Sequence, residues 1–165
     1  MSGADTATLA EAILNAAREK GLMIATAESC TGGMVAAALT DIAGSSDVFD
    51  RGFVTYSNAA KVAMLDVRQA TLDAHGAVSM ETAAEMAEGV LAHSQAGLAV
   101  SITGIAGPGG GSAEKPVGLV CFGLACKGGE TVAEAVRFDD TGRAGIRAAA
   151  QMHALEMLRR ALEQS

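Results

Sequence analysis

The chain has 165 residues, of which 50% are hydrophobic but only 3% aromatic, and its formal net charge is −7. This balance disfavours nucleic-acid binding, because such binding needs a basic face and, for single strands, aromatic side chains on which bases stack. The length predicts one domain over residues 1–165, with a core of Ala, Val, Leu, Ile and Met.

Cysteine usage and apolar runs exclude several other classes of protein. The three cysteines, Cys30, Cys121 and Cys126, form no CxxC pair, which argues against a disulfide framework or a zinc site. The three histidines have no metal-ligand spacing, so no metal is expected. No window holds 18 consecutive apolar residues and the N-terminus is acidic and polar, so we expect neither a membrane span nor a signal peptide. We therefore expect a cytoplasmic protein.

The first half of the chain alternates helical and extended patterns. Apolar residues at helical spacing predict a helix over 6–20, which Gly21 ends. An apolar run predicts a buried strand near 22–27. The elements expected after it are a helix to about residue 42, a loop over 44–47, a strand over 51–57, a short helix over 59–65 capped by Asn58, and a short helix near 68–74.

The second half continues this alternation and ends in a hairpin and a long helix. Ser79 is expected to cap a helix that runs to about residue 94. The elements expected after it are a strand over 98–102, a glycine-rich loop over 103–112, a central strand over 117–126, a turn at Gly128-Gly129, a strand over 131–138 and a helix over 141–162. Together they predict an α/β fold: a three-layer α/β/α sandwich with a mixed five-stranded sheet.

The joint between the first strand and the second helix is the first candidate site. Residues 27–33 read Ala-Glu-Ser-Cys-Thr-Gly-Gly, so two candidate nucleophiles, Ser29 and Cys30, lie at a strand-to-helix turn. Such a turn offers backbone N–H groups that can bind an anion or stabilise an oxyanion. The alternative is a capped helix start whose glycines serve close packing.

A serine can be activated by a lysine whose pKa is lowered by burial or by nearby positive charge. Among the four lysines, Lys61 would reach the edge of the sheet that carries Ser29 if the first two strands are parallel neighbours. The alternative is an exposed helical lysine. Tyr56, the only tyrosine, belongs either to the core or beside Lys61.

Two further segments could bind a ligand. The glycines over 103–112 would let backbone N–H groups approach a ligand closely, although a flexible turn is the alternative. Arg143 and Arg147, spaced i and i+4, could hold a phosphate or a carboxylate. Paired with Asp139 and Asp140, they would instead form a surface ion cluster.

These segments together resemble the CinA C-terminal domain family. The motifs that carry the resemblance cover nearly the whole chain: residues 27–33, Tyr56-Ser57-Asn58 with Lys61, residues 103–111, Lys115-Pro116-Val117-Gly118, and Arg143. The last is the loosest, because relatives often read Gly-Asp-Arg where this chain has Thr141-Gly142-Arg143. Longer members carry an additional N-terminal domain, and this chain looks like the stand-alone form.

The resemblance implies an amidohydrolase that converts nicotinamide mononucleotide to nicotinate mononucleotide and ammonia, with no cofactor or metal. Ser29 would attack the carboxamide carbon, Lys61 would take its proton, and Tyr56 would orient Lys61 or relay the proton. Backbone N–H groups at the start of the following helix would stabilise the oxyanion. The implied substrate-binding residues are Cys30, Thr31, Gly32, Asn58, Thr103, Gly104, Gly107, Gly109 and Arg143, of which Arg143 would meet the phosphate.

Two other functions are consistent with the same sequence. One is a non-catalytic nucleotide-binding or regulatory module of the same fold, and the other is a serine amidase acting on another small amide. The expected partner is a small nucleotide, with neither nucleic acid nor a membrane. The alanine-rich helices would support a homo-oligomer, most readily a dimer.

Overall fold

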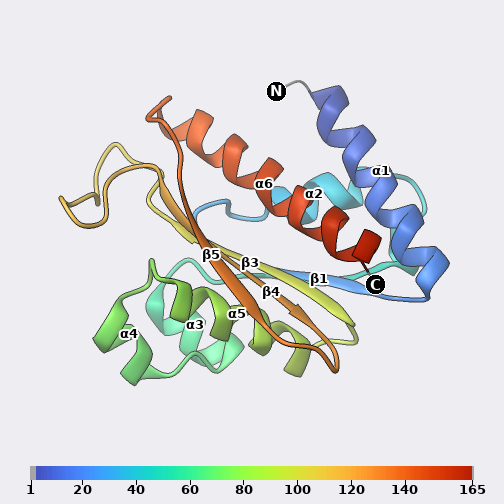
Figure 1. Ribbon diagram of the computed structural model, residues 1–165, viewed down its shortest axis with the longest axis horizontal. Helices are drawn as coiled ribbons and strands as arrows, with labels where there is room; N and C mark the ends of the chain where they lie inside the picture. The colour runs from blue at the N-terminus through green and yellow to red at the C-terminus, as the bar shows by residue number, and fades with distance from the viewer. Residues whose placement is uncertain (1–2, 165) are drawn as a thin grey trace.

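The backbone is organised around a five-stranded mixed sheet in the order β2-β1-β3-β4-β5 (Figure 1). The computed structural model describes residues 3–164. Strand β1 is parallel to both β2 and β3, whereas β4 is antiparallel to both β3 and β5. The strands are β1 (Ile24–Glu28), β2 (Phe49–Val54), β3 (Leu98–Gly104), β4 (Leu119–Cys126) and β5 (Val132–Arg137).

Helices cover both faces of this sheet and complete three layers. Helices α1, α2 and α6 lie over one face, and α3, α4 and α5 lie over the other (Figure 1). The predicted α/β/α sandwich with a mixed five-stranded sheet is confirmed. The helices are α1 (Gly3–Lys20), α2 (Met34–Thr40), α3 (Asn58–Leu65), α4 (Gln69–His75), α5 (Met80–Ala92) and α6 (Arg143–Gln164), with a 3₁₀ turn at Ser45–Asp47.

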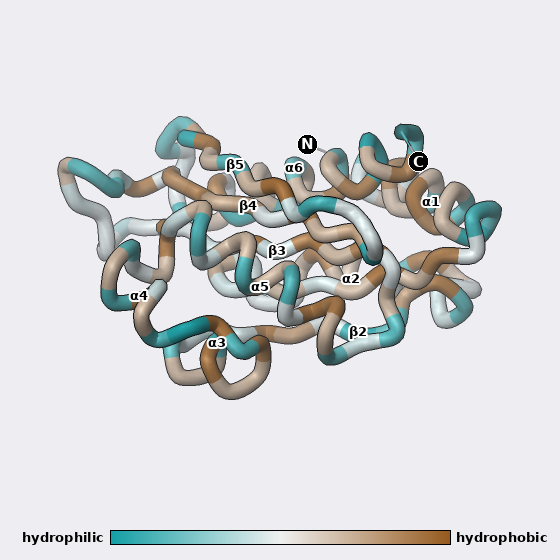
Figure 2. Tube along the Cα trace, turned by 60° about the horizontal axis from the view of Figure 1, so that its bottom comes forward, coloured by the Kyte–Doolittle hydropathy of each residue, from teal (hydrophilic) through white to brown (hydrophobic). Residues whose placement is uncertain are grey.

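The small side chains of the sequence allow helices to lie close to the sheet and to one another. A Cβ at Gly123 of β4 would come within 2.3 Å of the backbone oxygen of Ala83 in α5. A Cβ at Gly89 of α5 would likewise lie 2.1 Å from the backbone oxygen of Leu65 in α3. Strands β3 and β4 are largely apolar, while hydrophilic segments gather in the peripheral turns (Figure 2).

Several predicted element boundaries shift by a few residues. Ser57, not Asn58, caps α3, since its hydroxyl accepts a hydrogen bond from the N–H of Ala60 at 3.0 Å. Strand β4 begins at Leu119 rather than at residue 117, because a turn that needs a left-handed Gly118 precedes it. The expected cap at Ser79 is confirmed by its bond with the N–H of Thr82.

The parallel strands bring three loops to one edge of the sheet. Glu28, at the end of β1, is paired with Val54 of β2 and with Ile102 of β3. The segments that follow these three strands therefore leave the sheet side by side. The condition under which Lys61 would reach the edge that carries Ser29, that the first two strands are parallel neighbours, is met.

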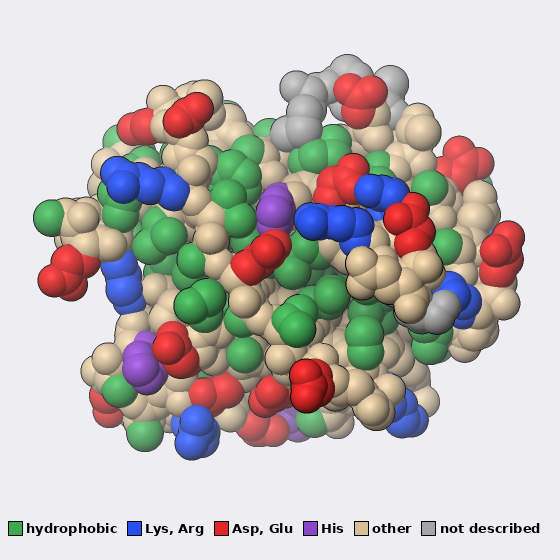
Figure 3. All heavy atoms as spheres, viewed as in Figure 1, with side chains coloured by type: hydrophobic (Ala, Val, Ile, Leu, Met, Phe, Trp, Pro, Cys, Tyr) green, Lys and Arg blue, Asp and Glu red, His purple; other side chains and the backbone are tan. Residues whose placement is uncertain are grey.

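The surface carries both signs of charge. On the face shown in Figure 3, basic side chains are interspersed with acidic ones rather than gathered into one patch. Across residues 3–164, no helix has both the length and the apolar character needed to cross a membrane.

Candidate active site

Ser29 is the first residue after β1, and the turn that follows it has an unusual backbone. The N–H of Ser29 donates to the oxygen of Ile102 at 2.9 Å, and the oxygen of Ser29 accepts from the N–H of Gly32 at 3.0 Å. Gly32 and Gly33 have φ values of 58° and 109°, the left-handed region that favours glycine. The glycines after Ser29 therefore let the chain turn sharply into α2 and keep the serine at the sheet edge.

Lys61 extends from α3 to this serine. Its Nζ lies 3.1 Å from the Oγ of Ser29 and 2.8 Å from the backbone oxygen of Thr55. The Lys61 residue is only 1% exposed, so the alternative of an exposed helical lysine is wrong. Burial lowers the pKa of Lys61, and the nearby Cys30 thiol opposes this to a smaller extent. A neutral amine at this distance can accept the serine proton.

Cys30, the second candidate nucleophile, is held in its unreactive, protonated form. Burial raises the pKa of its thiol to about 11, so near neutral pH it is protonated. Because the thiolate is the reactive form of cysteine, this environment favours Ser29 over Cys30 as the nucleophile.

Ser29 and Lys61 open on a pocket of about 250 Å³. Ten of the sequence-predicted site residues line it: Ser29, Cys30, Tyr56, Asn58, Lys61, Thr103, Gly104, Gly107, Gly109 and Arg143. Further lining comes from residues that sequence reasoning did not single out, among them Ala77 and Val78. The Thr103 hydroxyl fixes that wall by donating to the oxygen of Ala77 at 2.8 Å.

Two predicted substrate-binding residues, Thr31 and Gly32, are not among those that line the pocket. Thr31 is fully buried, and its hydroxyl donates to the Glu28 carboxylate at 2.7 Å. Gly32 faces Arg147, whose Nη2 would lie 3.3 Å from a Cβ at that position. Both residues lie in the turn next to the pocket rather than in its lining, and their contact with substrate stays a prediction.

The N-terminus of α2 is not open to the pocket, which corrects the expected oxyanion site. The N–H groups of Val35 and Ala36 donate to the Glu28 carboxylate at 2.9 and 3.1 Å. Those of Met34 and Ala37 donate to backbone oxygens. The first four N–H groups of the helix are thus satisfied within the protein, and Glu28 supplies the negative charge that a helix N-terminus favours.

Tyr56 and Arg143 form a contact across the pocket rim. The Nη2 of Arg143 donates to the Tyr56 hydroxyl at 2.9 Å, and its Nη1 donates to the oxygen of Gly107 at 2.8 Å. Tyr56 is 62% exposed, so it is not a core residue. The Lys61 amine is held by the backbone oxygen of Thr55, whereas the Tyr56 hydroxyl meets Arg143. Residues 3–164 show no ion pair between either candidate arginine and Asp139 or Asp140, so the surface ion cluster is not formed.

The glycine-rich segment forms another wall of the pocket. Two of its glycines stand where a side chain would collide with neighbouring residues. A Cβ at Gly104 would lie 2.9 Å from the Cα of Val120, and one at Gly107 would lie 2.6 Å from the side chain of Val117. Lys115 donates to the oxygen of His75 and does not line the pocket. No three His, Cys, Asp or Glu side chains within the described ranges come together as a metal site.

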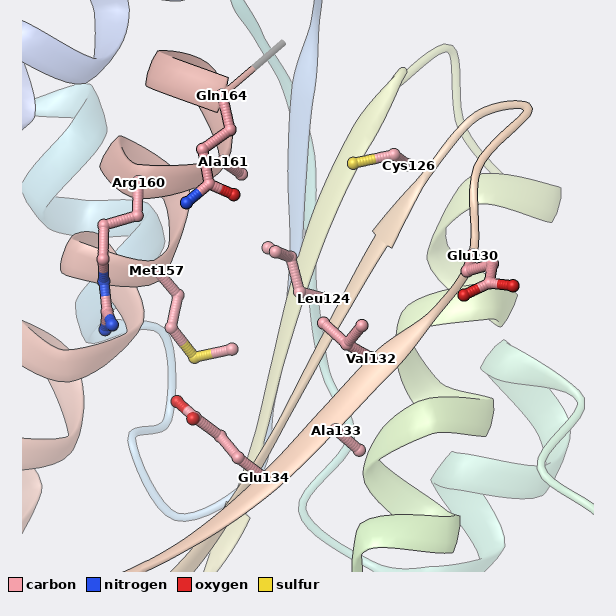
Figure 4. Close-up of a pocket in the computed structure, with 10 residues that line it drawn as sticks. All are labelled: Leu124, Cys126, Glu130, Val132, Ala133, Glu134, Met157, Arg160, Ala161 and Gln164. Carbon is pink, nitrogen blue, oxygen red and sulfur yellow. The ribbon is translucent and has the colours of Figure 1, made fainter.

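A second pocket, of about 430 Å³, lies between the C-terminal half of α6 and the β4–β5 hairpin (Figure 4). Leu124, Val132 and Met157 contribute its apolar walls, with Glu134 and Arg160 at its margin. Its lining includes the Cys126 thiol, whose pKa is raised by burial, and the Glu134 carboxylate is bonded to His153 of α6. The smaller pocket is therefore the better candidate for chemistry.

The sequence matches a known protein family over most of its length. The model of the CinA C-terminal domain matches residues 6–162. The chain belongs to this family. Among CinA relatives, the protein named nicotinamide-nucleotide amidohydrolase PncC of Escherichia coli K12 is 49% identical over 158 residues, which cover 96% of this chain and 95% of PncC. The crystal structure of competence/damage inducible protein CihA from Agrobacterium tumefaciens is 55% identical, with a TM-score of 0.93 over 96% of each chain.

Other CinA relatives are longer proteins. The CinA-like protein of Chlorobaculum tepidum is 56% identical over 133 residues, which cover 79% of this chain. The chain spans between 31% and 39% of the length of three such relatives. The match to these relatives thus concerns one domain of a larger protein.

Proposed function

We propose that the chain hydrolyses the carboxamide of nicotinamide mononucleotide to nicotinate mononucleotide and ammonia. The observation that carries this proposal is the buried Lys61 amine 3.1 Å from the Ser29 hydroxyl, at a pocket that Arg143 also lines. The substrate is suggested by PncC, which carries the name of this activity and matches over nearly the full length of both chains.

In the proposed mechanism, neutral Lys61 takes the Ser29 proton as Oγ attacks the carboxamide carbon. The tetrahedral intermediate then collapses, the carbon–nitrogen bond breaks, and Lys61 returns the proton to the departing nitrogen, which leaves as ammonia. A water molecule, deprotonated by Lys61, attacks the acyl ester and releases the carboxylate and the free serine. Over acylation and deacylation together, Ser29 and Lys61 return to their starting protonation states.

The oxyanion is assigned to the N–H of Cys30, the residue that follows the nucleophile and lines the pocket. An N–H donor aimed at a developing oxyanion contributes about 10²–10³ in rate. Arg143, at the pocket rim, is assigned to the phosphate, because a guanidinium forms charge-assisted bonds with phosphate oxygens. Asn58, Thr103 and the glycine wall would enclose the remainder of the nucleotide.

Ammonia release separates this proposal from its alternatives. We expect the highest kcat/KM with nicotinamide mononucleotide, and far lower values with nicotinamide, nicotinamide riboside and benzamide. Binding of the nucleotide without ammonia release would instead indicate a non-catalytic module. A higher kcat/KM for an amide without phosphate would indicate a different amidase.

We further propose that the protein forms a homodimer and resides in the cytoplasm. A homodimer is to be tested by analytical ultracentrifugation, where a sedimenting species of monomer mass would contradict it. The cytoplasm is the proposed compartment because all three cysteines are free thiols in the structure.

A further inference from the structure

Helix α6 presents three polar side chains at spacings of four residues, and each bonds a different segment near the pocket. Arg143 bonds Tyr56 and the glycine wall, as described above. Arg147 donates from Nε to the oxygen of Cys30 at 2.9 Å and from Nη2 to the oxygen of Thr31 at 3.3 Å. Gln151 donates to the oxygen of Met34 at 2.8 Å. The turn after Ser29 is therefore fastened to α6 by its carbonyl groups.

Arg147 is the unusual member of this row. Its guanidinium is half-buried, and within residues 3–164 no carboxylate lies within ion-pair distance of it. Removing a charge from water without a counter-charge costs free energy, so backbone carbonyls alone are a costly set of partners for simple stability. Arg147 is also absent from the pocket lining, so it does not reach a ligand there.

We propose that Arg147 is a positioning residue that orients the N–H of Cys30 for the oxyanion; this inference rests on the proposed function. Each peptide group is planar, so a bond that fixes a carbonyl also fixes the N–H of the next residue. Arg147 holds the Thr31 carbonyl, and the N–H of that plane belongs to Gly32. The Gly32 N–H donates to the oxygen of Ser29 at 3.0 Å. The plane of that oxygen carries the N–H of Cys30.

Two linked peptide planes thus run from the guanidinium to the proposed oxyanion donor. The planar fork of arginine can engage two carbonyls at once, whereas lysine offers a compact point charge. The guanidinium also fills the space above Gly32, whose backbone is left-handed. Loss of Arg147 should therefore let the turn change its orientation without disturbing the Ser29–Lys61 pair or the pocket wall.

The test compares Arg147→Ala, Arg147→Lys and a control, Arg160→Ala, which removes an exposed arginine from the same helix. We expect kcat for nicotinamide mononucleotide to fall about 10–100-fold in Arg147→Ala, with KM within about twofold of the unsubstituted protein, since donor geometry acts on the transition state. The kcat of Arg147→Lys should lie between those of Arg147→Ala and the unsubstituted protein. Added methylguanidinium should restore part of kcat in Arg147→Ala, and none in Ser29→Ala.

Backbone amide exchange, measured by NMR, gives a readout that does not depend on turnover. The Gly32 N–H should exchange faster in Arg147→Ala and stay unchanged in Arg160→Ala, while amides of β3 keep their protection. The proposal would be overturned if Arg147→Ala left both kcat and Gly32 exchange unchanged. It would also be overturned if the substitution changed only KM, or if it unfolded the protein and added methylguanidinium restored no activity. Absence of ammonia release from the unsubstituted protein would overturn the proposed function, whereas normal release by Arg147→Ala would overturn only this inference.

Discussion

The Nζ of Lys61 lies 3.1 Å from the Oγ of Ser29, although the two residues are 32 positions apart in the chain. They meet because β1 and β2 are parallel neighbours, so the turn after β1 and the helix after β2 begin at the same edge of the sheet. The backbone oxygen of Thr55 gives the amine a second partner and fixes its direction. This contact joins a hydroxyl to a buried amine and is the basis of the predictions below.

The pH dependence of catalysis should follow the amine of Lys61. Burial lowers the pKa of Lys61 from its ordinary value of about 10.4, and the base must be neutral to act. We expect kcat/KM to rise with pH until the folded-state pKa of Lys61 is passed, and then to level off. A pH–rate profile of ammonia release measures this, with Lys61→Met as the inactive control. A profile that is flat or falls over the same range would contradict the assignment.

The free energy of unfolding should depend on pH through the same Lys61 amine. Because the folded pKa of Lys61 lies below the unfolded one, the unfolded chain binds more protons at pH values between the two. The free energy of unfolding therefore rises with pH across this window, and the cost of burying the charged amine is fully present only below the folded pKa. Urea unfolding at a series of pH values should show this rise in the unsubstituted protein relative to Lys61→Met. Parallel curves for the two proteins would count against a buried, titrating amine.

The Tyr56 hydroxyl should act through Arg143. Its 2.9 Å bond with the guanidinium predicts that Tyr56→Phe raises KM about 3–10-fold and leaves kcat nearly unchanged. Arg143→Ala should raise KM further, and the double variant should be no worse than Arg143→Ala, because the two substitutions remove one shared contact. Steady-state kinetics on the four proteins measures the coupling. If Tyr56→Phe lowered kcat and shifted the pH limb, Tyr56 would act on Lys61 instead.

Glu28 should be important for stability as well as for the shape of the turn. Its buried carboxylate accepts hydrogen bonds from Thr31 and from two N–H groups of α2. Glu28→Ala leaves these donors without a partner and should lower the free energy of unfolding by about 2–4 kcal/mol. The exposed Glu163→Ala is the matched control and should change it by no more than about 0.5 kcal/mol. Equal unfolding midpoints for the two variants in urea would show that the cap has no such role.

Strand and helix periodicity predicted the layers. The pairing of Ser29 with Lys61 was implied by the resemblance to the CinA C-terminal domain family, because periodicity alone left an exposed helical lysine as the alternative. Neither predicted the surroundings of this pair. Residues 27–33 suggested an open helix N-terminus, yet Glu28 within the same motif occupies it. Whether the N–H groups of α2 reach that carboxylate depends on the left-handed turn at Gly32 and Gly33, a feature that periodicity does not encode.

The sequence also predicted the placement of the two arginines only in part. Their i, i+4 spacing placed Arg143 and Arg147 on one face of a helix, which is correct. It could not indicate which of them reaches the pocket, because that depends on where α6 crosses the sheet. Arg143 lies at the rim, and Arg147 lies behind the nucleophile turn.

The central claim is that the Ser29 hydroxyl is the nucleophile for the carboxamide of nicotinamide mononucleotide. The most direct measurement is ammonia release by Ser29→Ala and by Cys30→Ala, each compared with the unsubstituted protein at equal folded concentration. The account predicts that Ser29→Ala loses at least about 10³ in kcat, as expected for a covalent nucleophile, while Cys30→Ala stays within about tenfold because its thiol is protonated and buried. Near-normal turnover by Ser29→Ala, or the reverse order of the two variants, would contradict it.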